Sequence, residues 1–281
     1  MIKVLVTGAS GFLGPHLVLA LRAAGYDVIE ARRESGDIAD PATWKQFPKV
    51  DAVVHLAGKS FVPESWQVPD VFVRTNLGGA VQAMEYCRTH GAHLVYPSSY
   101  MYGDAVVQPS AESSPLVARN PYALSKKLAE ETGAFYAERF GLAITILRPF
   151  NIYGPGQSEA FLVPTILNQL TAGKAIRVQD LEPRRDYVYV VDVAEAMVKA
   201  LSAPRGLRVF NIGSGTSHSV GELINCIQEV WGTRLPVSSD GVRRKDEIMD
   251  TVADITQAEQ QLGWKPRFTL RQGMEALRAA V

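Results

Sequence analysis

The sequence predicts an α/β fold built as a doubly wound parallel sheet, and three observations support this. Short β-branched apolar runs, typical of strands buried on both faces, recur through residues 1–150. Segments with apolar residues at helical spacing separate them, and strands that alternate with helices form parallel sheets. Residues 151–281 lose this rhythm without a linker or an internal repeat. We therefore expect a sheet domain over 1–150 and a small substrate-binding part over 151–281, interleaved with the remaining sheet elements.

The predicted elements follow one another in order. Strands are expected at 2–6, 27–31, 51–56, 93–97, 143–147 and 209–212. Helices are expected at 13–24, about 71–89, 121–139, 162–172, from near 192, at 219–231 and after 269. An apolar run at 188–191 precedes the helix near 192.

Composition excludes several classes of protein. The 281 residues are 47% hydrophobic, and 29 basic residues balance 29 acidic ones, so no net field favours nucleic acid or an anionic membrane. Cys87 and Cys226 lie too far apart for a disulfide framework or a metal site. No apolar run approaches the roughly 20 residues that span a bilayer, and the chain opens directly on a strand pattern without a signal peptide. We expect a cytoplasmic protein without a membrane or nucleic-acid partner.

A glycine-rich turn joins the first strand to the first helix. Gly8 suits the tight turn, Gly11 permits close approach of a pyrophosphate, and Gly14 permits close packing of helix on strand. The backbone N–H groups at the helix start, at Phe12 and Leu13, can bind the anion. The context predicts a dinucleotide site, and the alternative is a structural turn without a ligand.

The end of the second strand carries the adenosine side of such a site. Arg32 and Arg33 suit the 2′-phosphate of NADP, whereas an acidic residue there would select NAD. Glu30 is expected to point elsewhere. Asp37 and Ile38 are placed beside the adenine. This favours NADP, with NAD still possible and a solvated basic loop as the alternative.

The segment 120–127 combines a phenol and an amine. Asn120 can cap a helix that begins at Pro121, and Tyr122 and Lys126 then share one helical face. A neighbouring cation is expected to lower the pKa of the phenol and so suit it to proton transfer. The alternative is an ordinary amphipathic helix.

Several motifs together resemble the extended short-chain dehydrogenase/reductases, in their sugar-nucleotide epimerase/dehydratase/reductase branch. The motifs are TGASGFLG, HLAG, NPYALSK, RPFNIYGPG, RRDYVYVVDVA and LGWKP. The resemblance covers nearly the whole chain. It implies a Rossmann-type NAD(P)-binding domain over 1–150, a nucleotide-diphosphate sugar as substrate, and a homodimer paired through the helices that begin near Val71 and Pro121.

The resemblance also assigns roles to residues near the cofactor. Tyr122 would exchange the proton at the reacting oxygen, and Lys126 would lower its pKa and hold the nicotinamide ribose. Ser98 would hydrogen-bond the same oxygen, with Ser99 as the nearest alternative. Asn76 matches a position near that ribose. Two further residues that close the third strand would line the cofactor, Leu56 and Ala57.

The nucleotide sugar would be held by Asn151, Arg185 and Arg244. Two guanidinium groups can clamp a diphosphate bidentately. The neighbouring arginines, Arg184 and Arg243, leave open which of each pair points inward. His55 is expected to be a packed core histidine.

The resemblance leaves three chemistries, of which dehydration is disfavoured. A 4,6-dehydratase places Asp-Glu directly after its Ser/Thr, and this chain has Ser99 and Tyr100 there. Arg32 and Arg33 favour an NADPH-dependent 4-keto-6-deoxyhexose nucleotide reductase. The alternative is an NAD-dependent 4-epimerase. A third hypothesis, of another class, is a cofactor-binding regulator without activity.

Overall fold

The computed structural model describes residues 1–103, 107–242 and 247–280. Its centre is a parallel sheet of six strands in the order β2-β1-β3-β4-β5-β9. The strands are β1 (Lys3–Thr7), β2 (Asp27–Ala31), β3 (Ala52–His55), β4 (His93–Pro97), β5 (Ile144–Pro149) and β9 (Leu207–Ile212). The order reverses between β1 and β3, which confirms the doubly wound parallel sheet; sheets of this class bind ligands at the carboxyl ends of the strands at that point.

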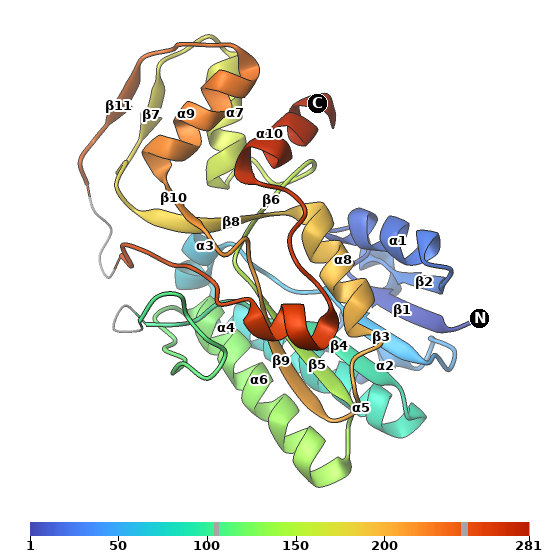
Figure 1. Ribbon diagram of the computed structural model, residues 1–281. Coiled ribbons are helices and arrows are strands. Elements are labelled where there is room, and N and C mark those ends of the chain that lie inside the picture. Colours follow the sequence, from blue (N-terminus) through green and yellow to red (C-terminus); the bar gives the residue numbers. More distant parts are fainter. Residues whose placement is uncertain (104–106, 243–246, 281) are drawn as a thin grey trace.

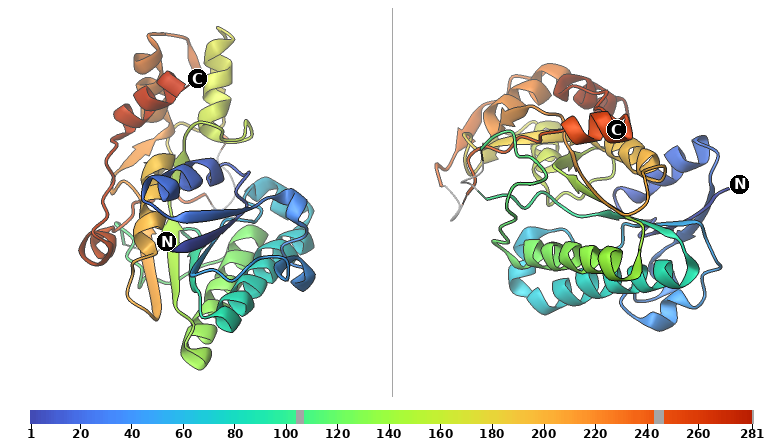
Figure 2. Two further views of the ribbon diagram at one scale, coloured as in Figure 1. Left: turned by 90° about the vertical axis from the view of Figure 1, so that its right-hand side faces the viewer. Right: turned by 60° about the horizontal axis from the view of Figure 1, so that its bottom comes forward.

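Helices cover both faces of this sheet. On one face α1 (Gly14–Ala23) packs against α8 (Val190–Ala200), and the other face carries α5 (Gly79–His90) and α6 (Pro121–Phe140) (Figure 1). Figure 2 shows the sheet between these two layers. Shorter segments complete this half: η1 (Arg33–Ser35), α2 (Pro41–Trp44), α3 (Val62–Gln67), α4 (Pro69–Phe72) and the π-helical η2 (Val73–Gly78).

Most of the chain after β5 forms two small sheets and several helices, which share a hydrophobic core of their own. Two small sheets have the orders β10-β8-β6 and β11-β7. Their strands are β6 (Asn151–Tyr153), β7 (Ile176–Val178), β8 (Arg184–Tyr189), β10 (Ser217–Ser219) and β11 (Val237–Ser239). The helices are α7 (Leu162–Thr171), α9 (Val220–Trp231), the π-helical η3 (Ala258–Leu262) and α10 (Leu270–Ala280). A separate hydrophobic cluster joins α7, α9 and α10.

Two predicted helices begin earlier in the chain than expected. The helix expected near 192 begins at Val190, because β8 ends at Tyr189 and Asp192 is already inside the first turn. The apolar run expected at 188–191 is divided between the end of β8 and the start of α8, and Arg185 lies within β8. The helix expected over 71–89 starts at Pro69 and is interrupted by the π-helical turn that carries Asn76. Such π-helical turns occur frequently at functional sites.

Candidate active site

The glycine-rich turn is fixed by close backbone contacts. Gly8 has φ +68°, and a Cβ added there would lie 2.7 Å from the Ala57 nitrogen, at the end of β3. A Cβ added at Gly14 would lie 2.2 Å from the Ala9 carbonyl oxygen. Gly11 donates its N–H to the Gly8 carbonyl at 2.9 Å. These contacts bring the turn against the carboxyl end of β3.

The start of α1 offers donors to an anion. Within the described residues, the backbone N–H groups of Phe12 and Leu13 have no protein acceptor. They lie at the N-terminus of a ten-residue helix, where the dipole favours negative charge. A pyrophosphate fits this arrangement.

Charged residues gather at the end of β2. Arg32 Nη2 lies 2.8 Å from Glu30 Oε2, and Arg22 Nη2 lies 2.8 Å from Glu30 Oε1. The hydrogen bond from Arg32 holds the pKa of the Glu30 carboxyl below its usual value. Glu30 and Arg32 lie on the same side of the chain, because residues two apart on an extended segment share a face. The expectation that Glu30 points away from the ribose stays a prediction. Arg33 is exposed and makes no ion pair with a described residue.

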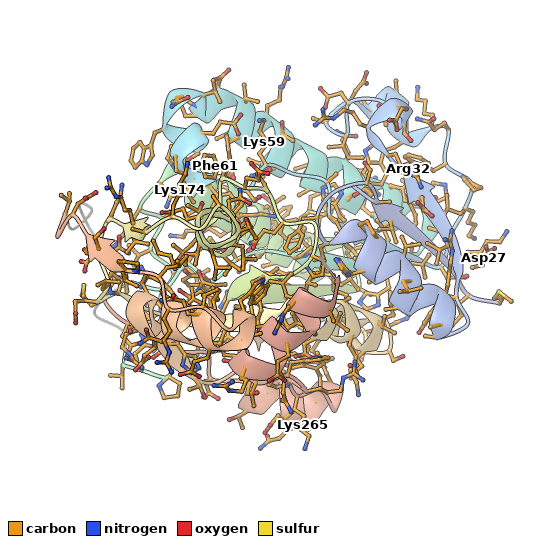
Figure 3. All side chains as sticks on the ribbon, turned by 90° about the horizontal axis from the view of Figure 1, so that it is seen from above. Asp27, Arg32, Lys59, Phe61, Lys174 and Lys265 are labelled. Atoms are coloured by element: carbon orange, nitrogen blue, oxygen red, sulfur yellow. The ribbon has the colours of Figure 1, made fainter. Side chains whose placement is uncertain are left out.

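The remaining predicted cofactor residues lie in the segments that follow β2 and β3. Asp37 accepts the Ala39 N–H at 3.0 Å, and the Ile38 carbonyl accepts the Trp44 indole N–H at 2.9 Å. Leu56 donates its N–H to the Thr7 carbonyl at 3.1 Å. Figure 3 labels Arg32 on the β2 side and Lys59 and Phe61 over the segment that follows β3.

Asn76 joins three segments. Its Oδ1 accepts the Lys59 N–H at 2.8 Å, and its Nδ2 donates to the Lys59 carbonyl at 3.0 Å and to Ser125 Oγ at 2.9 Å. The side chain is buried, so its amide fixes the loop after β3 against the helix that carries Tyr122. Sequence reasoning does not identify Ser125 or Lys59, since neither belongs to a recognisable pattern.

The helix with the phenol begins as predicted. The Asn120 side chain accepts the Ala123 N–H at 2.8 Å, and Pro121 is the first helical residue. The Tyr122 ring meets the Phe72 ring edge-on at 6.5 Å, and its hydroxyl hydrogen-bonds the Ser99 side chain. The phenol thus faces the segment that leaves the carboxyl end of β4.

Lys126 also faces the end of β4. Its Nζ donates to the Pro97 carbonyl at 2.8 Å and lies 4.7 Å from the centre of the Tyr96 ring. Burial lowers the pKa of Lys126 to about 8, and the Glu130 carboxylate acts in the opposite direction.

The expectation that Lys126 lowers the pKa of Tyr122 is wrong for this structure. Burial raises the pKa of Tyr122 above its usual value, and the hydrogen bond with Ser99 only partly opposes this effect. The Lys126 amine is turned towards a carbonyl and an aromatic face instead. Tyr122 is therefore a protonated phenol at neutral pH.

Ser98 is predicted to hydrogen-bond the reacting oxygen, with Ser99 as the alternative, and the two serines have different contacts in the structure. Ser98 is buried, and its hydroxyl has no partner among the described residues. Its backbone N–H donates to the Leu147 carbonyl at 2.7 Å, which fixes the segment against β5. Ser99 is the serine whose hydroxyl meets Tyr122. A buried hydroxyl without a partner, next to this contact, is available to a substrate oxygen.

Tyr100 orders the predicted substrate residue Asn151. Its hydroxyl donates to Asn151 Oδ1 at 3.1 Å, and its ring stacks on Phe150 with centroids 4.7 Å apart. The Asn151 amide also donates to the Asp186 carbonyl at 3.2 Å. In the sequence, Tyr100 serves only as evidence against a dehydratase, because it is not a carboxylate. The structure adds its contact with Asn151.

The two arginines at the start of β8 differ in burial. The Arg185 side chain is 17% exposed, pairs with Glu247 and donates to the Ile248 carbonyl at 2.7 Å. The Arg184 side chain is 38% exposed and pairs with Glu222. Arg185 is thus the more enclosed of the two. The predicted partner Arg244, and its neighbour Arg243, lie outside the described residues.

His55 is packed in the core, as expected. Its Nδ1 lies 2.9 Å from Thr7 Oγ1, and the ring stacks on Tyr96 at 6.2 Å. Burial lowers its pKa to about 3, with the Lys126 charge as the second cause. The ring is therefore neutral and unsuited to proton exchange near pH 7.

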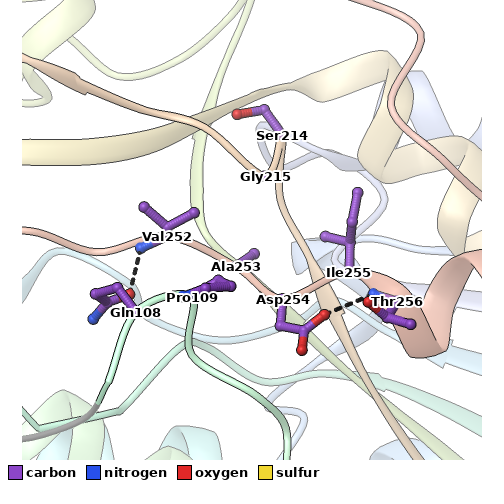
Figure 4. A pocket seen from close by; sticks show the side chains of 9 residues that line it. All are labelled: Gln108, Pro109, Ser214, Gly215, Val252, Ala253, Asp254, Ile255 and Thr256. Carbon is purple, nitrogen blue, oxygen red and sulfur yellow. Dashed lines mark hydrogen bonds between the residues drawn. The ribbon is translucent and has the colours of Figure 1, made fainter.

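An open pocket lies apart from these residues (Figure 4). Gln108 Oε1 accepts the Val252 N–H at 2.9 Å in its wall, and Asp254 Oδ1 accepts the Thr256 N–H at 3.0 Å. Among the described residues, none of the predicted site residues lines it. Within the same part of the chain, no cluster of acidic, His or Cys side chains suits a metal ion, and no helix is long and apolar enough to cross a membrane.

A glycine-rich turn between β1 and α1, a sheet reversal beside it and a phenol one helical turn from a lysine are typical of a nicotinamide-dependent oxidoreductase. The sequence profile of the NAD dependent epimerase/dehydratase family matches residues 4–213. The chain belongs to this family. It is an enzyme of the sugar-nucleotide epimerase/dehydratase/reductase branch of the extended short-chain dehydrogenase/reductases, which confirms the expectation from sequence.

Curated relatives include both reductases and epimerases. GDP-6-deoxy-D-mannose reductase of Pseudomonas aeruginosa is 30% identical over 98% of this chain and 95% of its own. UDP-glucose 4-epimerase of Lacticaseibacillus casei is 33% identical over 94% of this chain and 91% of its own.

The solved structures that resemble this chain include an epimerase with a nucleotide sugar and a protein with NADPH. The UDP-glucose 4-epimerase of Thermotoga maritima with UDP-glucose has a TM-score of 0.90 at 29% identity, covering 98% of this chain and 97% of its own. RMD from Pseudomonas aeruginosa complexed with NADPH has a TM-score of 0.89 at 29% identity, covering 99% of this chain and 98% of its own.

Proposed function

We propose that this protein is an NADPH-dependent reductase of a nucleotide-diphosphate 4-keto-6-deoxyhexose. The observation that carries the proposal is the site beyond β4, where Ser99 meets Tyr122 and Tyr100 holds Asn151. Elimination of water needs additional acid and base groups, and the two positions after Ser98 hold a serine and a tyrosine instead of carboxylates. The similarity to GDP-6-deoxy-D-mannose reductase supports the same chemistry.

Bound NADPH would supply a hydride to the carbonyl carbon, leaving NADP⁺. Tyr122 donates its phenolic proton to the carbonyl oxygen, so that the C=O double bond becomes a C–O single bond with one new C–H and one new O–H bond. The raised pKa of Tyr122 keeps that proton in place before the reaction. The Ser98 hydroxyl donates a hydrogen bond to the same oxygen as negative charge develops there. Lys126 would hold the nicotinamide ribose through its ammonium, which faces the carboxyl end of β4 rather than the phenol.

Other residues position the two ligands. The N–H groups of Phe12 and Leu13 hold the pyrophosphate of the cofactor, and Asn76 fixes the loop beside its nicotinamide ribose. Arg185, with Arg244, binds the diphosphate of the sugar nucleotide. Guanidinium groups suit this because each presents two parallel donors.

The preference for NADPH rests on Arg32 and Arg33. Arg33 has no ion-pair partner among the described residues and is free to bind a 2′-phosphate. Arg22 and Arg32 neutralise Glu30, which weakens its competition for the ribose. The structure of RMD with NADPH supports this choice, whereas related epimerase structures contain NAD. Calorimetric titration with NADPH and NADH tests it, and tighter binding of NADH would contradict it.

The proposed activity is tested with purified protein, NADPH, and GDP-, UDP- and dTDP-linked 4-keto-6-deoxyhexoses. We expect one NADPH to be oxidised for each keto-sugar consumed, with one of the nucleotides strongly preferred. A protein that oxidises no NADPH with any of these keto-sugars would contradict the proposal.

A 4-epimerase is the second candidate, because UDP-glucose 4-epimerases match nearly the whole chain. An epimerase oxidises and reduces its own substrate and so needs no net NADPH. Interconversion of UDP-glucose and UDP-galactose without added cofactor, at a rate above that of keto-sugar reduction, would favour it.

We also propose a homodimer paired through η2–α5 and α6. Leu124, Phe135 and Phe140 are exposed apolar residues of α6, which supports an apolar contact there. Light scattering should give twice the mass of one chain, and a mass equal to the 30.7 kDa chain would contradict this.

A further inference from the structure

A buried ion pair ties the catalytic helix to the sheet one turn beyond Lys126. Glu130 lies on α6 and Arg148 on β5, and their side chains are 6% and 7% exposed. Arg148 Nη2 lies 2.6 Å from Glu130 Oε2, and Arg148 Nε lies 3.1 Å from Oε1. Two parallel hydrogen bonds between such groups fix both distance and direction.

The spacing on α6 places this pair beside the proposed proton donor. Tyr122, Lys126 and Glu130 follow one another at intervals of four residues, so they lie along one face of the helix. Glu130 is the acidic group whose charge acts on Lys126 within the described part of the chain. Burial destabilises the Lys126 ammonium, and a carboxylate one turn away opposes that effect.

Arg148 also connects the pair to the segment that carries the serines. Its Nη1 donates to the Tyr102 hydroxyl at 3.0 Å and to the Glu112 carbonyl at 2.9 Å. The Tyr102 hydroxyl donates in turn to Asn211 Oδ1 on β9 at 2.6 Å. All these groups are fully partnered, so Glu130 cannot move without breaking bonds to β5 and to the segment after Ser98 and Ser99.

We propose that Glu130 and Arg148 form a positioning pair, in which Glu130 keeps Lys126 as an ammonium and Arg148 fixes Glu130 where it can do so. The inference rests on the role of Lys126 in the proposed function. An ammonium presents three hydrogen-bond donors and a positive charge to the nicotinamide ribose, whereas a neutral amine carries no charge and has one donor fewer. Arg148 holds the Glu130 carboxylate by donating hydrogen bonds to it. The carboxylate therefore cannot turn towards Lys126 and displace the Pro97 carbonyl as the acceptor of the Lys126 hydrogen bond.

Other titratable groups around Lys126 give no comparable negative charge. Tyr96 on β4 is a buried phenol with a pKa raised well above its usual value, and His55 on β3 is neutral. Tyr122, on the same helix, is protonated at neutral pH. On the side of α3 and η2, charged groups are already paired, as in Lys59 with Glu64 and Arg74 with Asp37.

The test is a pH titration of Lys126 followed by NMR of protein labelled at the lysine ε-carbons, with Lys126→Arg used to assign its signal. The wild-type midpoint is expected near pH 8. Glu130→Gln should lower that midpoint by about one pH unit or more, since burial and the unpaired Arg148 both disfavour the ammonium. Glu131→Gln is the matched control, because it removes an exposed carboxylate from the same helix and should leave the midpoint unchanged.

Glu130→Gln leaves a buried charge unpaired and can prevent folding. The variant Glu130→Gln/Arg148→Met removes the whole pair and should also lower the midpoint, by less than the single change. A wild-type midpoint in the folded single variant, or in the double variant where the single one does not fold, would overturn the proposal. The titration needs no substrate, so it separates failure of this inference from failure of the proposed reductase activity.

Discussion

Replacement of Gly14 by alanine tests how the glycine turn shapes the cofactor site. The added Cβ would lie 2.2 Å from the Ala9 carbonyl oxygen and 2.5 Å from its carbon, both backbone atoms that cannot rotate away. The turn and α1 must separate by about 0.8 Å before the closest contact reaches 3.0 Å, so overpacking should cost about 1–3 kcal/mol. Alanine recovers roughly 0.5–1 kcal/mol of helix propensity.

The expected net loss is about 1–2 kcal/mol in the free energy of unfolding, measured by urea denaturation. Because the shift displaces the N–H groups of Phe12 and Leu13, NADPH affinity should fall at least about tenfold, or 1.4 kcal/mol. Calorimetric titration measures that affinity.

Gly221→Ala is the control, since it also lies in the first turn of a helix, α9. A Cβ added at Gly221 would meet no atom closer than 3.7 Å, so this variant should be as stable as the wild type or slightly more stable. Equal stability and equal NADPH affinity of Gly14→Ala and the wild type would refute the reasoning.

Three further predictions concern the proposed site and its surroundings. Tyr122→Phe should lower kcat about 10²–10⁴-fold and leave the NADPH Kd unchanged, because only the proton donor is lost; an equal loss in Kd would contradict this. Arg185→Met should raise the KM for the nucleotide sugar about tenfold or more, whereas the exposed Arg184→Met should change it little, and the reverse ranking would assign the site to Arg184. His55 has a folded pKa of about 3, below its unfolded value, so the unfolded state binds more protons and stability is lost as pH falls from about 6.5 towards 3. Between pH 7 and 5 the wild type should lose about 2 kcal/mol more than His55→Asn in urea denaturation, and equal losses would disprove this cause.

The sheet and its order of strands and helices could be predicted because the apolar runs are strong and local. The cap at Asn120 and the apolar run at 27–31 depend on neighbouring residues only. The π-helical turn at Asn76 could not be predicted, since it depends on contacts with Lys59 and Ser125, which are distant in sequence.

The sequence indicates candidate residues for the site, whose roles stay predictions, but it does not indicate their electrostatics. Spacing alone places Tyr122 and Lys126 on one helical face, yet the pKa of Tyr122 is set by burial, which the sequence does not contain. The side of β2 on which Glu30 lies likewise became clear only from its contacts with Arg22 and Arg32. Glu130 has a signal in the sequence, its spacing of four residues from Lys126, whereas its partner Arg148 lies on another strand.

Transfer of deuterium tests the central claim most directly. Purified protein is incubated with NADPH deuterated at C4 of the nicotinamide and with a nucleotide-linked 4-keto-6-deoxyhexose, and the product is analysed by mass spectrometry. We predict one deuterium at C4 of the sugar for each NADPH oxidised. A keto-sugar left unreduced while NADPH stays constant, or a reduced sugar without deuterium at C4, would contradict the account.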